Sequence, residues 1–542
     1  MKEIYINGDI YTSSATDADS FIVENGRFVY VGDTETALNL AEDKDKIIDL
    51  KKAFVTAGFN DSHMHVLNYG YSLTMVNLSK HTTSLKEVKE ALKSFIALEE
   101  IDKDRWILGR GWNHDYFEDE KRFPTRYDLD CVSTEYPICI TRACGHVSVV
   151  NSKALEIMGV NNKTPQVDGG RFDVDVSGEP LGIFRENALS FIFDKIPTPS
   201  KEEIKAMILR ACKNLNAYGV TSAQTDDFSA LPGIDYEIIL KAYKELEEER
   251  KLTVKIYEQT LFNNLRDIKN YLEKGYNTGI GTDYFRLGPL KLLGDGSLGA
   301  RTAYLSEPYS DDSSTRGISA FNKEDLGLII SYAHNSNMQI AVHCIGDGIM
   351  TEVMEAYERA LKNKPRENHR HGIVHCQIAN EELLSKFKEL NLHGYIQSIF
   401  LDYDINIIEK RVGKERAKTS YNFKTIMNNS SISNGSDCPV ELPNVLKGIQ
   451  CAVTRKTLNG EKGPYLIEEA LSMEEAIKSY TIFGAYSSFE EEIKGSIEKD
   501  KVADFVIMDK SLFKVPESEI KEIQILETYV DGKCVYKHKS AK

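Results

Sequence analysis

TAGFNDSHMH, at residues 56–65, is the stretch that decides the fold. Apolar residues lead into it, and it ends in two histidines, His63 and His65, separated by one residue. Because alternate residues of an extended strand point to the same side, both rings can face one metal ion. Two solvated histidines at a polar strand end would give the same pattern, so the motif alone leaves both interpretations open.

Further along the chain, apolar strands alternate with amphipathic helices. One such helix has apolar residues at Leu326, Ile329, Ile330 and Ala333, which is helical spacing. Eight candidate strands with helices between them predict a closed, parallel (β/α)8 TIM-like barrel of the α/β class rather than an open sheet. The candidate strands are Phe54–Phe59, Val220–Gln224, Leu252–Tyr257, Leu287–Leu293, Ile340–Cys344, Gly372–Cys376, Gly394–Ser398 and Ser431–Ser436.

Three more possible metal ligands each end one of these strands, namely His343, His375 and Asp437. A single histidine at such a position is more often a satisfied core residue. In a barrel, however, the carboxyl ends of the strands meet at one face, where catalytic groups gather. Their joint placement therefore predicts one metal site shared with His63 and His65.

Lys291 lies on the fourth candidate strand, with apolar residues on both sides. A lysine at a strand edge can extend its amine to water without any role in chemistry. Burial would instead disfavour the charged ammonium. A neutral amine can add carbon dioxide and become a carbamate, which is an anionic oxygen donor able to bridge two metal ions. The fourth strand is therefore another candidate source of a ligand.

Both ends of the chain consist of short alternating strands with turns, so we expect residues 1–54 and 489–542 to form one composite β-sandwich. The barrel is expected over residues 55–488. About 150 residues separate His65 from Val220, whereas one strand-to-strand unit of such a barrel averages about 30. An inserted subdomain is therefore expected at about 70–200, and its exit from the first strand predicts a lid over the catalytic face.

The composition is that of a globular protein, with 41% hydrophobic and 28% charged residues. The formal net charge of −16 argues against a nucleic acid or an anionic membrane as partner. The first residues lack the apolar core of a signal peptide, and no apolar run approaches the ~20 residues that a membrane span needs. We therefore expect no nucleic-acid or membrane partner, whereas the charge says little about a small-molecule substrate.

Cysteine usage indicates a reducing compartment. The chain has nine cysteines, none in a Cys-x-x-Cys pair, and Cys139, Cys144, Cys344 and Cys376 lie in apolar, strand-like runs. This pattern is typical of reduced, mostly buried thiols in a cytoplasmic protein. The sequence leaves the oligomeric state open, with a homodimer as one alternative.

Together these motifs resemble the amidohydrolase superfamily, and specifically its amidohydrolase-3 branch of N-substituted formamide deformylase-like, metal-dependent hydrolases. The resemblance covers nearly the whole chain, and no expected ligand position departs from the pattern. The motifs that carry it lie at residues 58–65, 111–115, 145–152, 291–299, 343–347, 375–377, 436–439 and 495–498.

The resemblance implies a role for each ligand. His63, His65 and Asp437 would hold the more buried of two divalent metal ions, His343 and His375 would hold the second, and carbamylated Lys291, formed with carbon dioxide, would bridge them. Zinc is the first expectation, although iron, manganese, cobalt or nickel would accept the same donors. Asp437 would take the proton of a metal-activated water and pass it to the departing amine. The candidates for the substrate pocket are Trp112, His146, Asp295, Arg301 and Gln397.

The implied activity is hydrolysis of an amide, or another non-peptide carbon–nitrogen bond of a small molecule, through a metal-activated hydroxide. The nearest enzymatic alternative is a mononuclear deaminase of a nucleobase-like ring. Such an enzyme needs no carbamylated lysine, so Lys291 disfavours it. An alternative of another class is a catalytically silent scaffold of the same fold, which would tolerate loss of ligands.

Overall fold

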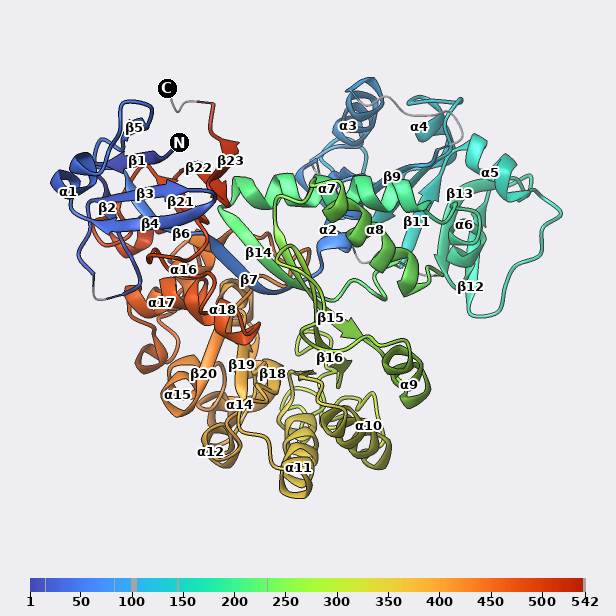
Figure 1. Cartoon of the computed structure of the whole chain (residues 1–542). Coiled ribbons are helices and arrows are strands. Elements are labelled where there is room, and N and C mark those ends of the chain that lie inside the picture. The colour runs from blue at the N-terminus through green and yellow to red at the C-terminus, as the bar shows by residue number, and fades with distance from the viewer. Residues whose placement is uncertain (15, 82, 99–104, 144–145, 232, 540–542) are drawn as a thin grey trace. The chain divides into compact units, whose positions relative to one another are not determined.

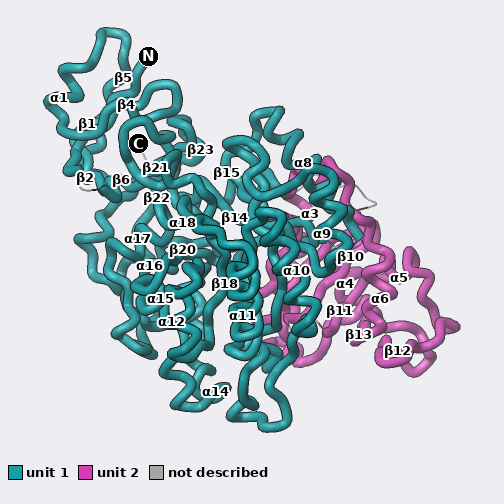
Figure 2. Tube along the Cα trace, turned by 60° about the horizontal axis from the view of Figure 1, so that its bottom comes forward, with its two compact units in different colours: residues 1–69, 208–542 teal, residues 70–207 magenta. Residues whose placement is uncertain are grey.

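The computed structural model describes the chain except for residues 15, 82, 99–104, 144–145, 232 and 540–542 (Figure 1). It divides into two compact units, shown in different colours in Figure 2. Unit 1 contains residues 1–69 and 208–542, and unit 2 contains residues 70–207.

Unit 1 is built around an eight-stranded, all-parallel sheet, which confirms the predicted TIM-like barrel. Its strands pair in chain order, and the first and last meet where the Asp437 amide donates to the His63 carbonyl at 2.8 Å. The strands are β7 (Phe59–Met64), β14 (Val220–Thr225), β15 (Lys255–Leu261), β16 (Phe285–Leu293), β17 (Ile340–Cys344), β18 (Gly372–His375), β19 (His393–Ile396) and β20 (Ser431–Asn434).

Helices connect these strands, and their amphipathic faces explain their packing. Helix α10 (Lys323–Asn335) buries Leu326, Ile329, Ile330 and Ala333, the positions that the helical spacing predicted. Asparagine or aspartate side chains cap the amino ends of several of these helices, for example at Asp235, Asn264, Asn322 and Asn380. The other helices along the unit are α2 (Val66–Ser72), α7 (Lys201–Ala217), α8 (Tyr236–Glu248), α9 (Leu265–Glu273), α11 (Asp347–Asn363), α12 (Glu381–Glu389), α13 (Leu401–Asp404), α14 (Ile408–Ala417), α15 (Phe423–Asn429), α16 (Val445–Thr454), α17 (Met473–Ser479) and α18 (Ile482–Ser487).

The expected first barrel strand, Phe54–Phe59, is wrong in its bounds, because Gly58 divides that run into two strands. Strand β6 (Phe54–Ala57) pairs with the terminal sheet, and the first barrel strand starts only at Phe59. The Gly58 amide donates to the Asp504 carbonyl, whereas the next amide, that of Phe59, donates to the Gly219 carbonyl. A Cβ at Gly58 would lie 2.2 Å from Thr221 Oγ1, so only glycine fits where the chain passes from one sheet to the other.

The two ends of the chain do pair with each other, through β6 and β21 (Phe505–Met508). Two sheets form the sandwich, β4-β3-β1-β5 and β2-β6-β21-β22-β23. Its core includes aromatic rings from both ends of the chain, such as Tyr5 stacked on Phe21 at 4.7 Å and Phe505 stacked on Tyr529 at 4.3 Å. The remaining elements are β1 (Glu3–Ile6), β2 (Asp9–Ile10), β3 (Ser20–Glu24), β4 (Arg27–Gly32), α1 (Thr34–Asn39), β5 (Lys46–Asp49), β22 (Ile525–Val530) and β23 (Lys533–Lys537).

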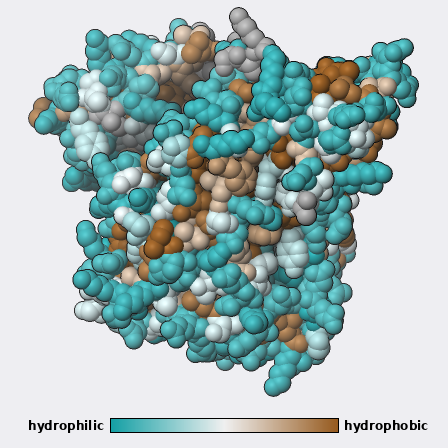
Figure 3. Space-filling view, turned by 90° about the vertical axis from the view of Figure 1, so that its left-hand side faces the viewer, coloured by the Kyte–Doolittle hydropathy of each residue, from teal (hydrophilic) through white to brown (hydrophobic). Residues whose placement is uncertain are grey.

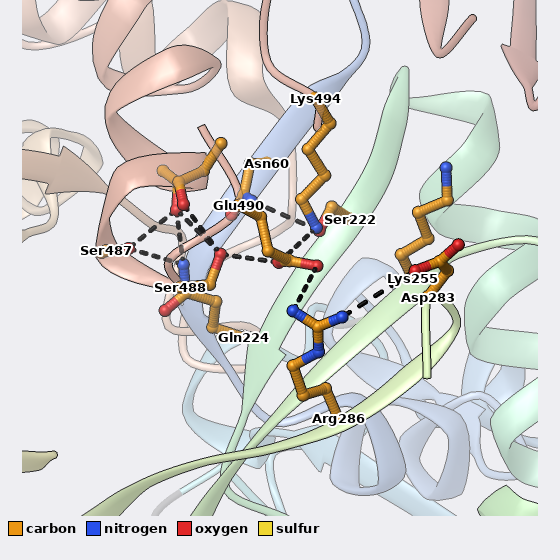
Figure 4. A network of polar contacts seen from close by, with 12 residues as sticks. Asn60, Ser222, Gln224, Lys255, Asp283, Arg286, Ser487, Ser488, Glu490 and Lys494 are labelled. Carbon is orange, nitrogen blue, oxygen red and sulfur yellow. Dashed lines mark hydrogen bonds and ion pairs between the residues drawn. The ribbon is translucent and has the colours of Figure 1, made fainter. Parts of the chain in front are cut away.

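A polar network joins the barrel strands to the segment at residues 487–494 (Figure 4). The Lys494 ammonium contacts Ser222 Oγ on β14 at 2.7 Å and the Glu490 carboxylate at 2.7 Å. Both Lys494 and Glu490 are buried, and each charge has an opposite charge beside it. Lys255 makes a similar link, since its ammonium lies 2.7 Å from both Asp504 and Asp531 of the terminal sandwich.

Unit 2 is an α/β subdomain with its own core. Its six-stranded sheet has apolar clusters that include Leu78, Trp112 and Ile140 in one and Cys139, Phe172 and Phe184 in the other. That it covers the catalytic face stays a prediction. Its elements are β8 (Val76–Asn77), α3 (Leu85–Leu98), β9 (Ile107–Trp112), α4 (Arg126–Asp130), β10 (Ile138–Arg142), β11 (Val147–Val150), α5 (Ser152–Met158), β12 (Gly170–Val174), β13 (Pro180–Glu186) and α6 (Ser190–Phe193).

The structure shows where the hydrophilic residues and the cysteines of the chain lie. On the face drawn in Figure 3, hydrophilic side chains predominate and apolar ones lie in scattered patches. Eight cysteines lie in the described part of the chain and all are free, whereas Cys144 lies outside the described residues. Among the described residues, no helix combines the length and the apolar character needed to cross a bilayer.

Several histidines are buried in neutral surroundings at the amino ends of the barrel strands. The His393 ring lies between Ser431 Oγ at 2.8 Å and Ser433 Oγ at 2.7 Å, and burial lowers its pKa to about 3. Burial also lowers the pKa of His369 to about 4. A folded-state pKa below the unfolded value of 6.5 means that the folded chain disfavours the protonated ring. The contribution of the neutral ring to the free energy of unfolding is fully present above pH 6.5. It is lost as the pH falls toward the folded-state pKa.

We expect the free energy of unfolding to fall by about 2 kcal/mol for His393 alone between pH 7.5 and pH 5. Urea unfolding followed by circular dichroism at each pH measures it. The variant His393→Gln should show a shallower pH dependence by about this amount. The control Ser433→Ala keeps the titrating ring, so it should retain the full pH dependence. An unchanged pH dependence in His393→Gln would contradict the assignment.

Candidate metal centre

The structure brings together all six residues that the sequence predicted as ligands. They lie at the carboxyl ends of β7, β16, β17, β18 and β20. His375 Nε2 lies 2.9 Å from His343 Nδ1, and Asp437 Oδ1 lies 2.8 Å from His65 Nε2. Lys291 Nζ lies 3.1 Å from His63 Nε2, and the centroids of the His63 and His375 rings are 5.5 Å apart. Its side chain has no exposure to solvent, so Lys291 does not extend to water.

Three of these histidines are held by an oxygen acceptor on the ring nitrogen that points away from the centre. Each acceptor requires a proton on that nitrogen, so the other nitrogen presents its lone pair to the centre. The bonds are His63 Nδ1 to Gln259 Oε1 at 3.0 Å, His375 Nδ1 to Gln397 Oε1 at 2.7 Å, and His343 Nε2 to the Gly296 carbonyl at 3.1 Å. These acceptors therefore favour, in each of the three rings, the tautomer that a metal ion at the centre would bind.

Asp226 holds the fourth ring, and the sequence analysis missed it. Its carboxylate contacts His65 Nδ1 and lies 3.1 Å from Lys291 Nζ, and its side chain is buried. It directly follows β14, the second barrel strand. A carboxylate just after a predicted strand is the same pattern that identified Asp437, so Asp226 could have been found by applying that rule to every strand.

Charge is unevenly distributed within the centre. Burial by itself would lower the pKa of His65, yet the Asp226 and Asp437 carboxylates outweigh it and raise that pKa to about 10. Burial, reinforced by the Lys291 charge, lowers the pKa of His343 to about 4. Burial likewise lowers the pKa of His63 well below its usual value. The metal-free centre therefore holds a charged His65 beside neutral rings.

These residues fit divalent metal ions. The ligand atoms of His63, His65 and Asp437 lie within 4.8 Å of one another. Imidazole nitrogens with carboxylate oxygens are the donors that zinc and other first-row divalent ions bind. Two carboxylates, those of Asp226 and Asp437, lie beside the His65 ring, and a cation is favoured next to such a pair.

Two residues of the centre have backbone conformations that side chains seldom adopt. His375 has φ +78° and Asp437 has φ +56°, both in the left-handed region. Neither is glycine, so each conformation is held at some cost by its surroundings. Strain of this kind is concentrated at sites where a side chain must point in a set direction.

A cavity of about 550 Å³ opens beside the centre. It is formed by the loops that follow β16, β17, β18, β19 and β20. His343, His375 and Asp437 line it together with Gly296, Ser297, Leu298, Gly299, Thr302, Ile345, Gln377, Phe400, Tyr403, Asp404, Val440 and Glu441. A substrate in this cavity would therefore meet three of the candidate ligands directly.

The predicted pocket residues of unit 1 support the centre from behind. Asp295 accepts hydrogen bonds from the amides of Ile345, Gly346 and Tyr304, and burial raises its pKa to about 7. Arg301 pairs with Asp311 at 2.9 Å. Gln397 is the buried partner of His375. In these positions Asp295 and Gln397 orient the metal-site loops and rings.

The two predicted pocket residues of unit 2 differ in exposure. Trp112 is fully buried in the core of that unit. His146 is exposed and lies 3.0 Å from the Glu186 carboxylate. Gly145, which begins the motif at 145–152, lies outside the described residues. A pocket role for Trp112 and His146 stays a prediction.

Known proteins resemble this chain over nearly its full length. Residues 46–536 match the sequence pattern of the amidohydrolase family. The YtcJ protein of Bacillus subtilis (strain 168) is 31% identical over 99% of both chains. N-substituted formamide deformylase of Arthrobacter pascens is 25% identical over 99% of this chain and 98% of its own. The crystal structure of a metal-dependent hydrolase from Pyrococcus furiosus is 31% identical, with a TM-score of 0.77, covering 95% of this chain and 100% of that one.

We expect Asp226→Ala to weaken metal binding about 10- to 100-fold, because His65 loses the carboxylate that orients its ring. Asp226→Asn should weaken it less, since an amide oxygen still accepts from His65 Nδ1. Titration of the metal-free protein with zinc measures the affinity without reference to turnover. The matched control is Asp227→Asn. The native Asp227 carboxylate accepts hydrogen bonds from the Leu67 amide and the Tyr243 hydroxyl, not from His65. Wild-type affinity in Asp226→Ala would contradict the orienting role, and loss of a full equivalent of metal would make Asp226 a direct ligand.

Proposed function

The chain belongs to the amidohydrolase family, and we propose that, among the metal-dependent hydrolases of this family, it cleaves an amide or another non-peptide carbon–nitrogen bond of a small molecule. One observation carries the proposal. Six ligands and Asp226 converge at the carboxyl ends of the barrel strands, beside a cavity large enough for a small molecule.

The proposed centre holds two divalent ions, zinc being the first candidate. His63, His65 and Asp437 would hold one ion, and the facing nitrogens of His343 and His375 would hold the other. Bound ions of this kind acidify water and polarise a carbonyl oxygen. Lys291 lies beside His63 and Asp226 and is fully buried. Carbon dioxide would add to its neutral amine, forming an N–C bond and releasing a proton. The product is the proposed bridging carbamate.

Asp437 is the proposed proton carrier. Its carboxylate lines the cavity and lies 2.8 Å from His65 Nε2. In hydrolysis, the oxygen of water bonds to the carbonyl carbon, the carbon–nitrogen bond breaks, and the departing amine needs a proton. A carboxylate at this position can accept the proton of the attacking water and deliver it to the amine. The products are a carboxylic acid and an amine.

Two observations favour the proposal over the alternatives. A mononuclear deaminase does not need a carbamylated lysine, and the buried Lys291 beside His63 and Asp226 disfavours that alternative. A silent scaffold could lose ligands without consequence, yet all six positions carry metal-binding side chains whose tautomers or charges are favoured by buried neighbours. Both features favour a working binuclear hydrolase.

We expect the purified protein to contain close to two divalent ions per chain and to hydrolyse members of a panel of N-acyl and N-formyl amines. Elemental analysis and amine release measure the two quantities. Exhaustive chelation should abolish turnover, and zinc should restore it, because the protein groups alone cannot acidify water and polarise the carbonyl as a divalent ion does. Full activity in protein without detectable metal would overturn the proposal.

We expect Lys291→Ala to fold but to retain fewer than two ions, since the anionic bridge is lost. Lys291→Glu should retain more metal than the alanine variant, because it places a carboxylate near the same position. Carbon-13 NMR of wild-type protein prepared in labelled bicarbonate should show a carbamate signal that both variants lack. If Lys291→Ala kept both ions and full turnover, the bridging role would be wrong.

A further inference from the structure

Gln377 is a buried polar residue that no part of the proposed chemistry uses. It lies two positions after His375, its side chain is 3% exposed, and it lines the cavity beside the centre. Its backbone is fixed, because its carbonyl accepts from the Tyr421 amide at 2.8 Å. Its side-chain Oε1 is buried without a hydrogen-bond partner among the described residues.

Several other buried glutamines of the barrel have partners for their amide oxygens. Gln259 and Gln397 each accept from a histidine of the centre. Gln339 accepts from the Tyr257 hydroxyl and donates to the Arg370 carbonyl. Gln224 Oε1 is also without a partner among the described residues, but Gln224 does not line the cavity. A buried amide oxygen without a partner loses its hydration and gains nothing in return, so such a group calls for an explanation. Since Gln377 lines the cavity, a ligand there can provide the missing partner.

Away from the candidate metal ligands, the cavity wall has apolar, neutral polar and acidic side chains. Leu298, Ile345 and Phe400 provide apolar surface, and the Phe400 ring stacks against the His375 ring at 6.0 Å between centroids. Asp404 and Glu441 provide two carboxylates. Among the described residues that line the cavity, none is a lysine or an arginine. An anionic group placed beside Asp404 and Glu441, and not at the metal ions, would therefore meet negative charge without a basic side chain as partner.

We propose that Gln377 recognises the substrate, and that the substrate is an uncharged amide with an apolar group and no carboxylate. This inference rests on the proposed function and names its substrate class. The Gln377 carboxamide would hydrogen-bond a neutral polar group of the substrate, while the apolar group packs on Leu298 and Phe400. Asp404 and Glu441 would exclude anionic relatives of the same shape.

The first test measures binding separately from turnover. Phenethylurea serves as an unreactive probe, titrated by calorimetry into the zinc-loaded protein. We expect Gln377→Leu to weaken its binding about 5- to 30-fold, with metal content unchanged. The melting temperature should stay the same or rise, because an unpaired buried amide is replaced by an apolar group of similar size.

A structural role for Gln377 predicts the reverse result. If Gln377→Leu lowered the melting temperature and left probe binding unchanged, the proposal would be overturned. The comparison variant is Gln397→Leu, which removes an amide that is paired with His375. It should lower both stability and metal affinity, which separates a glutamine that supports the fold from one that meets the ligand.

The second test concerns charge. The zinc-loaded protein should bind phenethylurea at least about ten-fold more tightly than its para-carboxylate derivative, and Glu441→Gln should narrow that ratio. Equal binding of the two probes would contradict the proposal that the cavity excludes anionic substrates. Absence of amine release after each titration checks that neither probe is hydrolysed during the measurement. If both binding results hold but no amide of the panel is cleaved, the proposed reaction fails while the recognition by Gln377 stands.

Discussion

Two backbone hydrogen bonds between the first and last barrel strands hold the centre together. The Asp437 amide donates to the His63 carbonyl, and the His65 amide donates to the Cys438 carbonyl, each at 2.8 Å. These bonds close the barrel and bring His65 within 2.8 Å of Asp437, although the two residues lie 372 positions apart in the chain. Because parallel strands all end at one face, closure at this seam is what converts five separate strand ends into one site.

Electrostatics explains why such a closed site must bind cations. Four titratable groups, His65, Lys291, Asp226 and Asp437, are buried or nearly so within a few ångströms of one another. Without metal, the ring of His65 takes up a proton, as its raised pKa shows. A divalent ion would displace that proton and supply the same charge at the same place. The neighbouring neutral rings keep their lone pairs free because burial and like charge oppose their protonation.

Much of this architecture follows from the sequence alone. The alternation of strands and helices predicted the barrel, and strand ends predicted His343, His375 and Asp437, because these patterns are local. Gly58 was not recognised as a boundary, since its need for a bare Cα depends on Thr221 across the sheet. Asp226 was missed because the strand-end rule was not applied to the second strand, and the contacts that give Asp226 and Gln377 their roles are, like those of Gly58, not local. Their importance lies in which side chains surround them after folding, and one chain without its relatives does not record those contacts.

Three residues at the centre have features that cost stability. His375 and Asp437 keep left-handed backbones, and Gln377 keeps an unpaired buried amide, and each of these lowers stability in the chain by itself. The buried polar groups of Gln339 and His393, by contrast, have hydrogen-bond partners. His375, Gln377 and Asp437 all line one cavity, where a ligand can compensate for their cost. The cavity and the candidate metal centre are therefore best understood as a single site.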